Sequence, residues 1–176
     1  EMDAEASAEI VADMREFRAL KILEEFELDD VTDVISELEE PDRVRLLSKL
    51  SPEKAKQVRA LLKYAPETAG GVMNPNFISV QEYMTVNEAI EHIRRLKDKI
   101  SHMTYVYVVD KSKKLKGFFS MKDLVLAKAD EKIANIMQTD LKGVCSVNED
   151  REKIALTMGE LNLYELPVVD DQGRLL

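Results

Sequence analysis

The first part of the chain reads as a series of short amphipathic helices, because apolar residues recur at helical spacing up to about Tyr64. One such apolar face is formed by Val31, Val34, Ile35 and Leu38. No glycine interrupts this segment. The short helices and short connections predict helical hairpins stacked as in an α-solenoid.

Two helix starts can be placed in this segment, because proline is tolerated at the first helical position. They are Glu40-Pro41-Asp42 and Ser51-Pro52-Glu53, where Ser51 can act as a cap. We expect the first helix to bury Val44, Leu47 and Leu50, and the second to bury Ala55, Val58, Leu61 and Leu62.

A strong break follows in residues 68–75, Thr-Ala-Gly-Gly-Val-Met-Asn-Pro, which contain two adjacent glycines and a proline. We interpret the glycines as the end of the last helix and as a swivel between two domains. Beyond Gly71 the spacing of apolar residues changes from a helical pattern to one with strand-like runs. Segments 77–80, 105–110 and 115–120 predict strands, and helices are expected to begin near Val86 and Met121.

The order of strand, helix, hairpin and helix then recurs. Residues 146–149 echo residues 85–88, and Asp110 and Asp170 occupy the same place in the two copies. The predicted fold class is therefore α+β, with an α-solenoid-like helical N-terminal domain (1–66) and two βαββα repeats (67–130 and 131–176). The second copy has no counterpart of the Gly117–Asp123 segment of the first copy. We therefore expect the second copy to be truncated and the natural chain to continue.

Composition narrows the class of protein. With 45% hydrophobic and 34% charged residues, the 176-residue chain is typical of a globular protein. Its net charge of −9 argues against nucleic acid as a partner and is compatible with cations. Cys145 is the single cysteine and is expected to be a small buried apolar residue. No arrangement of nucleophile, base and oxyanion donor can be found, so we do not expect an enzyme.

The candidate metal ligands of the helical segment are Asp29 and Asp33. They are four residues apart, which places two like charges on one helical face. One interpretation is that Asp29 caps the helix and Asp30 complements the positive end of its dipole. The other is a divalent-cation site, because hard cations bind carboxylate oxygens and relieve the repulsion.

The tandem repeat of about 60 residues resembles a cystathionine-β-synthase (CBS) domain pair. Short acidic helices, the run Glu67-Thr68-Ala69-Gly70-Gly71-Val72-Met73 and two CBS repeats together are similar to the cytosolic part of MgtE-type magnesium channels and transporters. The resemblance covers nearly the whole chain. It implies a magnesium sensor in which Mg²⁺ between acidic surfaces of the N and CBS domains favours a compact dimer and closes a pore.

In that resemblance, Asp29 and Asp33 fall where the N domain offers its ligands, and Glu152 matches an acidic position on the CBS side. The alternative for Glu152 is a solvated carboxylate at a helix start. Asn162 stands where the family can place an aspartate, so one ligand is expected to be weaker or absent.

Adenine nucleotide, ATP or a related molecule, is a second ligand that the resemblance implies. Ser120-Met121-Lys122-Asp123 fits the Ser/Thr-x-x-Asp pattern that binds the ribose, and Tyr105 is expected to line the adenine pocket. The alternative is that Ser120 caps a helix and Asp123 lies in its first turn.

The resemblance further implies a homodimer through the CBS domains, joined to a transmembrane pore domain of its own at the cytoplasmic face of the membrane. Two other functions stay open. One is a nucleotide-sensing CBS module of another channel or enzyme, and the other is a helical adaptor that binds protein partners.

Overall fold

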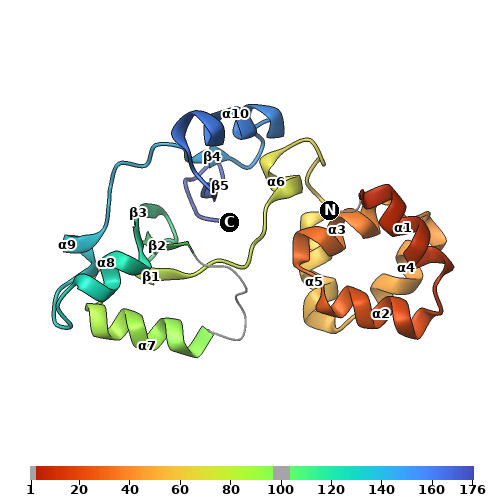
Figure 1. The fold of residues 1–176 in the computed structure, drawn as a ribbon, viewed down its shortest axis with the longest axis horizontal. Helices are drawn as coiled ribbons and strands as arrows, with labels where there is room; N and C mark the ends of the chain where they lie inside the picture. The colour runs from red at the N-terminus through yellow and green to blue at the C-terminus, as the bar shows by residue number, and fades with distance from the viewer. Residues whose placement is uncertain (1–2, 97–103) are drawn as a thin grey trace. The chain divides into compact units, whose positions relative to one another are not determined.

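The computed structural model describes residues 3–96 and 104–176, which form two compact units, Glu1–Asn74 and Pro75–Leu176. The first unit is helical and the second combines helices with two small sheets, so the fold class is α+β as predicted (Figure 1). Each unit has its own hydrophobic core.

The first unit is built from short helices in two layers. Helix α1 packs against α3 and α3 packs against α5, while α2 packs against α4. This alternation is the arrangement of stacked helical hairpins that the sequence predicts. The bounds are α1 (Ala4–Asp13), α2 (Glu16–Glu25), α3 (Leu28–Glu37), α4 (Glu40–Lys49), α5 (Pro52–Leu61) and α6 (Ala69–Val72).

The buried face of α4 differs from the prediction. Val44 is 60% exposed, and Leu46 is fully buried instead. The cause is Arg43, whose Nη2 donates to the carbonyl oxygens of Ser36 and Leu38 at 2.9 and 2.8 Å, at the C-terminal end of α3. Positions 43, 46, 47 and 50 share one helical face, so anchoring Arg43 inward turns Val44 outward.

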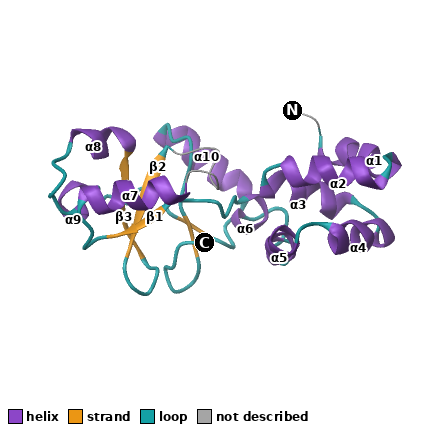
Figure 2. Ribbon diagram, turned by 90° about the horizontal axis from the view of Figure 1, so that it is seen from below, coloured by secondary structure: helices purple, strands orange, loops and turns teal. Residues whose placement is uncertain are grey.

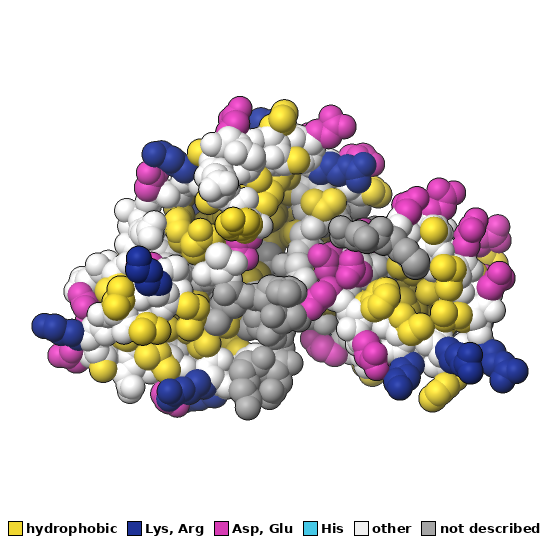
Figure 3. Space-filling model, in the orientation of Figure 1, with side chains coloured by type: hydrophobic (Ala, Val, Ile, Leu, Met, Phe, Trp, Pro, Cys, Tyr) yellow, Lys and Arg dark blue, Asp and Glu magenta, His cyan; other side chains and the backbone are white. Residues whose placement is uncertain are grey.

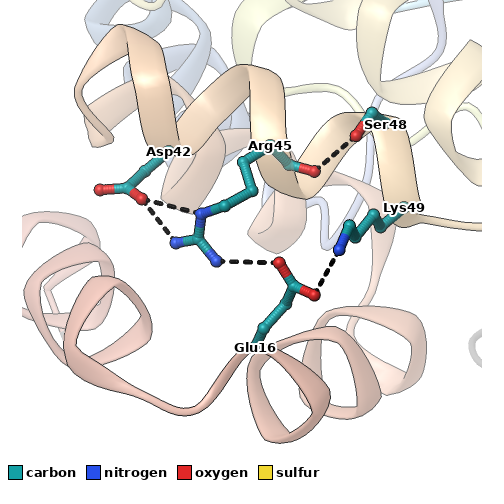
Figure 4. A network of polar contacts seen from close by, with 5 residues as sticks. All are labelled: Glu16, Asp42, Arg45, Ser48 and Lys49. Atoms are coloured by element: carbon teal, nitrogen blue, oxygen red, sulfur yellow. Dashed lines mark hydrogen bonds and ion pairs between the residues drawn. The ribbon is translucent and has the colours of Figure 1, made fainter.

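Ion pairs on the surface join α2 to α4 (Figure 4). Glu16 accepts from Arg45 Nη1 at 3.3 Å and from Lys49 Nζ at 2.5 Å, while Arg45 also pairs with Asp42. The hydrogen bond from Lys49 is the largest cause of the lowered pKa of Glu16. Because these side chains are partly exposed, each pair contributes little stability.

The glycine pair does not end a helix, contrary to the sequence interpretation. Gly70 and Gly71 lie inside α6, both are buried, and neither has a positive φ. A Cβ on Gly71 would collide with the backbone oxygen of Ala65 and lie 2.8 Å from Cα of Pro66. Glycine is therefore required here for close packing of two backbone segments.

The second unit carries the repeated strands and helices (Figure 2). In the larger sheet β1 pairs with β2 in parallel and β2 pairs with β3 antiparallel, whereas β4 and β5 form a parallel pair. The bounds are β1 (Ser79–Gln81), α7 (Val86–Leu96), β2 (Tyr105–Val109), β3 (Leu115–Ser120), α8 (Met121–Leu126), α9 (Ile133–Ile136), β4 (Cys145–Ser146), α10 (Arg151–Leu161) and β5 (Val168–Val169).

The two faces of the larger sheet are covered differently. Val106 and Val108 of β2 pack in one core with residues of α7, α8 and α9. Tyr107 and Val109, which point to the opposite face, pack with Leu175 of the second repeat. The sheet therefore joins the two repeats into one unit.

The repeat predicted from sequence is reproduced in detail by the two hairpin turns. Oδ1 of Asp110 accepts backbone N–H groups of Ser112 and Lys114, and Oδ1 of Asp170 accepts those of Gln172 and Arg174. The turns also bond to each other reciprocally, because Leu115 N donates to the carbonyl of Gly173 and Leu175 N donates to that of Lys113. This symmetry is what a duplicated unit predicts.

Candidate metal and nucleotide sites

Asp29 lies in the first turn of α3, next to other acidic side chains. The residue before this helix is Glu27, so Asp29 is the second helical residue and does not cap it. Burial is the largest cause of the raised pKa of Asp29, and the charges of Asp30 and Glu27 add to it. The Asn74 amide Nδ2 donates to Oδ1 of Asp29 at 3.2 Å and to Oε2 of Glu27 at 3.3 Å.

The surroundings of Asp29 make its ionised form unfavourable. A carboxylate with a raised pKa is poorly compensated when ionised, and a nearby positive charge relieves that cost. Asp33 lies one turn further along α3 and is exposed. Sequence reasoning identified the aspartates but not Glu27 or Asn74. Asn74 is 45 positions from Asp29 along the chain, so its contact with Asp29 cannot be seen in the sequence.

The third candidate metal ligand, Glu152, lies in the first turn of α10 in the second unit. It is exposed, and its backbone N–H donates to Oδ1 of the capping residue Asp150 at 2.8 Å. Asn162 ends the same helix in a left-handed conformation, with φ of 52°, a role to which asparagine is suited. Among residues 3–96 and 104–176, no three His, Cys, Asp or Glu side chains gather as a metal site.

Ser120 and Asp123 form a capping box at the start of α8. The Ser120 hydroxyl accepts from Asp123 N at 3.3 Å, and Asp123 Oδ2 accepts from Ser120 N at 2.8 Å and from its hydroxyl at 2.7 Å. The hydroxyl bond is the largest cause of the lowered pKa of Asp123. The capping role, one of the two interpretations that the sequence leaves open, is therefore present. The cap also stabilises the anionic form of Asp123, and such a carboxylate is an acceptor of the kind that ribose hydroxyls would bind.

Tyr105 lines a cleft between the two repeats. It stands opposite Ser120 in the register of β2 and β3, so the three nucleotide candidates share one end of the sheet. The Tyr105 and Phe118 rings meet edge to face with centroids 5.1 Å apart. The cleft is small and open, with a cavity volume of about 20 Å³. Its other lining residues are Tyr107, Leu141, Lys142, Val144, Leu163, Glu165, Leu166 and Pro167.

Glu165 is a residue of this cleft that sequence reasoning missed. Its Oε1 accepts the backbone N–H of Tyr105 at 2.9 Å, and burial raises the pKa of its carboxyl. Burial, with the nearby Glu165 charge as a smaller cause, raises the pKa of the Tyr107 hydroxyl well above its usual range. The available signal was an acidic residue directly before the apolar run Leu166-Pro167-Val168-Val169.

The remaining chemistry-bearing and apolar groups belong to packing or surface. Cys145 is buried as predicted, and burial raises the pKa of its thiol to about 11. Hydrophobic side chains also reach the surface of both units (Figure 3). The most exposed of them include Phe17, Val125, Leu126 and Tyr164. In the part of the chain that the structure describes, no helix has the length and apolarity to cross a membrane.

Two family models match the chain. The model described as the MgtE intracellular N domain matches residues 1–67, and the CBS domain model matches residues 69–130. Magnesium transporter MgtE of Thermus thermophilus is 36% identical over 152 residues, covering 85% of this chain and 34% of that protein. Magnesium transporter MgtE of Enterococcus faecalis is 34% identical over 124 residues, covering 70% of this chain and 27% of that protein. The chain thus spans about a third of the length of the curated relatives it matches.

Among solved structures, the chain is similar to the crystal structure of the cytosolic domain of the Mg²⁺ channel MgtE in complex with ATP. The TM-score is 0.93 at 35% sequence identity, and the match covers 99% of this chain and 71% of that one.

Proposed function

The chain belongs to the MgtE family of magnesium transporters, and we propose that it forms the magnesium-sensing cytosolic region of such a transporter. In this proposal Asp29 and Asp33 on α3 and Glu152 on α10 hold Mg²⁺. The bound ion supplies positive charge that cancels carboxylate repulsion. The compact, dimeric state that results closes the pore of the full-length protein.

The observation that carries this proposal is the environment of Asp29. Its half-buried carboxylate lies beside Asp30 and Glu27, and both burial and these charges make its ionised form unfavourable. Two carboxylates ~4 Å apart repel by about 4 kcal/mol at an effective dielectric constant near 20. Mg²⁺ keeps several waters and needs one or two carboxylates, so Asp29 with one neighbour is a sufficient protein contribution.

The residues act by charge. At low Mg²⁺, Asp29, Asp33 and Glu152 lose the positive charge of the ion, which disfavours close approach of the acidic surfaces that bear them. Lowered Mg²⁺ therefore shifts the population toward the open arrangement. Because the shift is limited by the difference in affinity between the two states, several weak sites are expected to act together.

Thermal melting of the 176-residue chain tests the proposal. A ligand at 100 times its dissociation constant stabilises the native state by about 2.7 kcal/mol, which corresponds to a rise of roughly 5–10 °C for a domain of this size. We expect that rise in Mg²⁺ but not in a monovalent salt of matched ionic strength. Equal melting temperatures in the two salts would contradict magnesium sensing by this chain.

A second ligand, an adenine nucleotide, is favoured by the cleft lined by Tyr105. The cleft is apolar, it lies at the end of the sheet where Ser120 and Asp123 hold an anionic carboxylate, and a similar MgtE domain was crystallised with ATP. We propose that Tyr105 packs on the base and that Asp123 binds the ribose. Isothermal titration calorimetry with ATP in EDTA tests this, because EDTA removes the chelation of Mg²⁺ by ATP from the measured heat.

A further inference from the structure

The two hairpin turns of the second unit bring basic residues together at one edge. Lys111, Lys113 and Lys114 belong to the turn between β2 and β3, Lys116 follows in β3, and Arg174 belongs to the turn after β5. All five residues are exposed. The turns lie side by side, because Lys114 and Arg174 face each other in an isolated β-bridge (Figure 2). These five residues form a basic edge in a chain whose net charge is −9.

The acidic residues of the two turns cancel this positive charge only in part. Asp110 and Asp170 are half-buried, and their Oδ1 atoms accept backbone N–H groups of their own turns. Their Oδ2 atoms pair with Lys116 at 3.6 Å and with Arg174 at 2.7 Å. Asp171 is exposed. The other three lysines of the basic edge form no ion pair with any residue that the structure describes.

Lys113 occupies a backbone position that favours glycine. Its φ is 64°, and the corresponding residue of the other turn is Gly173, with φ of 74°. A Cβ disfavours this left-handed conformation, and lysine is not among the residues that tolerate it best. Because the two turns have the same pattern of backbone bonds, glycine would serve the hairpin equally well in the first turn. The lysine therefore adds nothing to the hairpin, but it adds a positive charge to the basic edge.

The simplest explanation of exposed lysines is solubility. Solubility does not require the charges to lie together, and like charges that are close repel one another. Here Lys111, Lys113 and Lys114 lie within four consecutive positions and next to Arg174. Solubility explains neither this crowding nor a lysine in the left-handed conformation. An anionic partner would replace the repulsion between these side chains with attraction.

We propose that the basic edge binds the anionic phospholipid headgroups of the membrane that holds the transporter. The proposal uses the part of the proposed function that makes the chain the cytosolic region of a transporter, and it is independent of Mg²⁺ and nucleotide binding. Salt screens charges beyond about 8 Å at physiological ionic strength. A flat surface that touches only this edge therefore meets mainly positive charge. Nucleic acid fits less well, because a long polyanion would also meet the acidic surface of the chain.

The expected strength of this contact suits a tethered protein. A lysine close to an anionic membrane strengthens binding about fivefold, so the three lysines without an ion-pair partner contribute on the order of a hundredfold. Such binding is weak for a free protein. Linkage to a transmembrane domain would raise the local concentration of headgroups and make the contact effective.

Flotation of the 176-residue chain with lipid vesicles tests the proposal. The vesicles contain phosphatidylcholine alone or with about 40% phosphatidylglycerol, in EDTA so that no divalent cation bridges acidic residues to lipid. We expect flotation with the anionic vesicles alone at about 50 mM salt, and release at about 300 mM salt. In the variant with Lys111→Gln, Lys113→Gly and Lys114→Gln, the partition coefficient should fall at least about tenfold. Its melting temperature should be equal or higher, because glycine suits the left-handed position.

The matched control removes three charges from exposed positions outside the basic edge, through Lys56→Gln, Lys63→Gln and Lys128→Gln. It should lower the partition coefficient by less than about twofold, because those charges do not touch the membrane. Equal binding to neutral and anionic vesicles, binding to neither, or equal losses in the two variants would each overturn the proposal. None of these outcomes would alter the Mg²⁺-dependent rise in melting temperature, so failure of this inference is distinguishable from failure of the magnesium sensor.

Discussion

The side-chain amide of Asn74 donates a hydrogen bond to the carboxylate of Asp29, with Nδ2 3.2 Å from Oδ1. The same amide reaches Glu27, so a neutral donor bridges two acidic side chains at the start of α3. An N–H group compensates a carboxylate only in part, whereas a divalent cation would compensate it more fully. In the proposed sensor, the Asn74 amide and Mg²⁺ therefore compete for the same oxygen.

Replacing Asp29 and Asp33 together by Asn should remove much of the Mg²⁺ response. The double variant deletes two anionic ligands but keeps the size of both side chains. Without Mg²⁺ its melting temperature should equal that of the unmodified chain or be slightly higher, because Asp29 is ionised at the cost of partial burial. Thermal melts with and without millimolar Mg²⁺ measure both effects.

The matched control for that variant is Glu5→Gln with Glu9→Gln. These glutamates are also four residues apart on one helix, α1, and both are exposed. The control should keep the whole Mg²⁺-dependent gain. If the aspartate variant keeps it too, the sensing carboxylates lie elsewhere, and Glu152 becomes the remaining candidate among those named.

Asn74→Ala should increase the gain in melting temperature that Mg²⁺ produces. Loss of the amide removes a donor to Asp29 and Glu27 and should lower stability without Mg²⁺ by up to about 1 kcal/mol. The cation-bound state should lose less, since the cation satisfies the same carboxylates. Asn148→Ala, at an exposed position of the second unit, is the control. An unchanged Mg²⁺ gain in Asn74→Ala would show that amide and ion do not share the oxygen.

The repeated turns could be predicted from sequence because their determinants are local. Asp110 and Asp170 each bond backbone groups two and four residues ahead, so the same short pattern gives the same turn twice. The start of α5 at Pro52 is also determined by a local feature, the proline at the first helical position, and the sequence predicts it correctly.

What sequence could not provide depends on contacts between distant positions. The exposure of Val44 follows from hydrogen bonds of Arg43 to the end of α3. The spacing of apolar residues along the chain does not reveal these bonds. At Gly71 the sequence predicts a conformational break, because the close approach of the Ala65 backbone cannot be seen in the sequence. Glu165 was missed for a similar reason, since its partner Tyr105 belongs to the other repeat.

Dimerisation through the second unit should depend on the exposed apolar end of α8. Val125 and Leu126 are 76% and 73% exposed, which is unusual for adjacent large apolar side chains. Val125→Glu with Leu126→Glu should weaken self-association at least about tenfold while changing monomer stability by less than about 0.5 kcal/mol. Analytical ultracentrifugation over a concentration series measures the association constant.

Phe17→Glu is the control for the α8 variant, because Phe17 is 79% exposed on α2 of the first unit. It should leave the association constant unchanged. A monomer at high concentration for the unmodified chain, with and without Mg²⁺, would contradict dimerisation itself. Unchanged association of the Val125 and Leu126 variant would place the interface on another surface.

Replacing two glycines by alanine should have opposite effects on stability. Gly71→Ala puts a Cβ against the backbone of Ala65 and Pro66, neither of which can move as a flexible side chain would, and should cost about 1–3 kcal/mol. Gly159→Ala meets no atom within 4 Å on the exposed part of α10 and should stabilise by about 0.5–1 kcal/mol. Chemical denaturation measures both, and a neutral Gly71→Ala would contradict the close-packing explanation.

Capping and nucleotide binding by Ser120 and Asp123 can be separated with a second capping box in the same unit. Thr85 and Glu88 at the start of α7 make the same set of bonds, with Glu88 Oε2 accepting from Thr85 N at 2.7 Å and Glu88 N donating to the Thr85 hydroxyl at 3.2 Å. Thr85→Ala and Ser120→Ala should therefore lower stability by similar amounts, about 1 kcal/mol each.

The pH dependence of these losses follows from the lowered pKa values of Asp123 and Glu88, for which bonds to Ser120 and Thr85 are the leading causes. A carboxyl whose pKa is lower in the folded state contributes stability above its unfolded pKa of about 4 and loses it as the pH falls through the folded value. The difference between each variant and the unmodified chain should thus be largest near neutral pH and shrink in acid.

ATP affinity then distinguishes the two boxes. Asp123→Asn keeps a side-chain oxygen for the cap but loses the anion that would bind the ribose hydroxyls, so its affinity for ATP should fall about tenfold with little change in melting temperature. Thr85→Ala should leave ATP affinity unchanged although it lowers stability. If Asp123→Asn binds ATP as tightly as the unmodified chain, the Ser120–Asp123 pair serves the helix alone and Tyr105 remains the candidate nucleotide-binding residue to test.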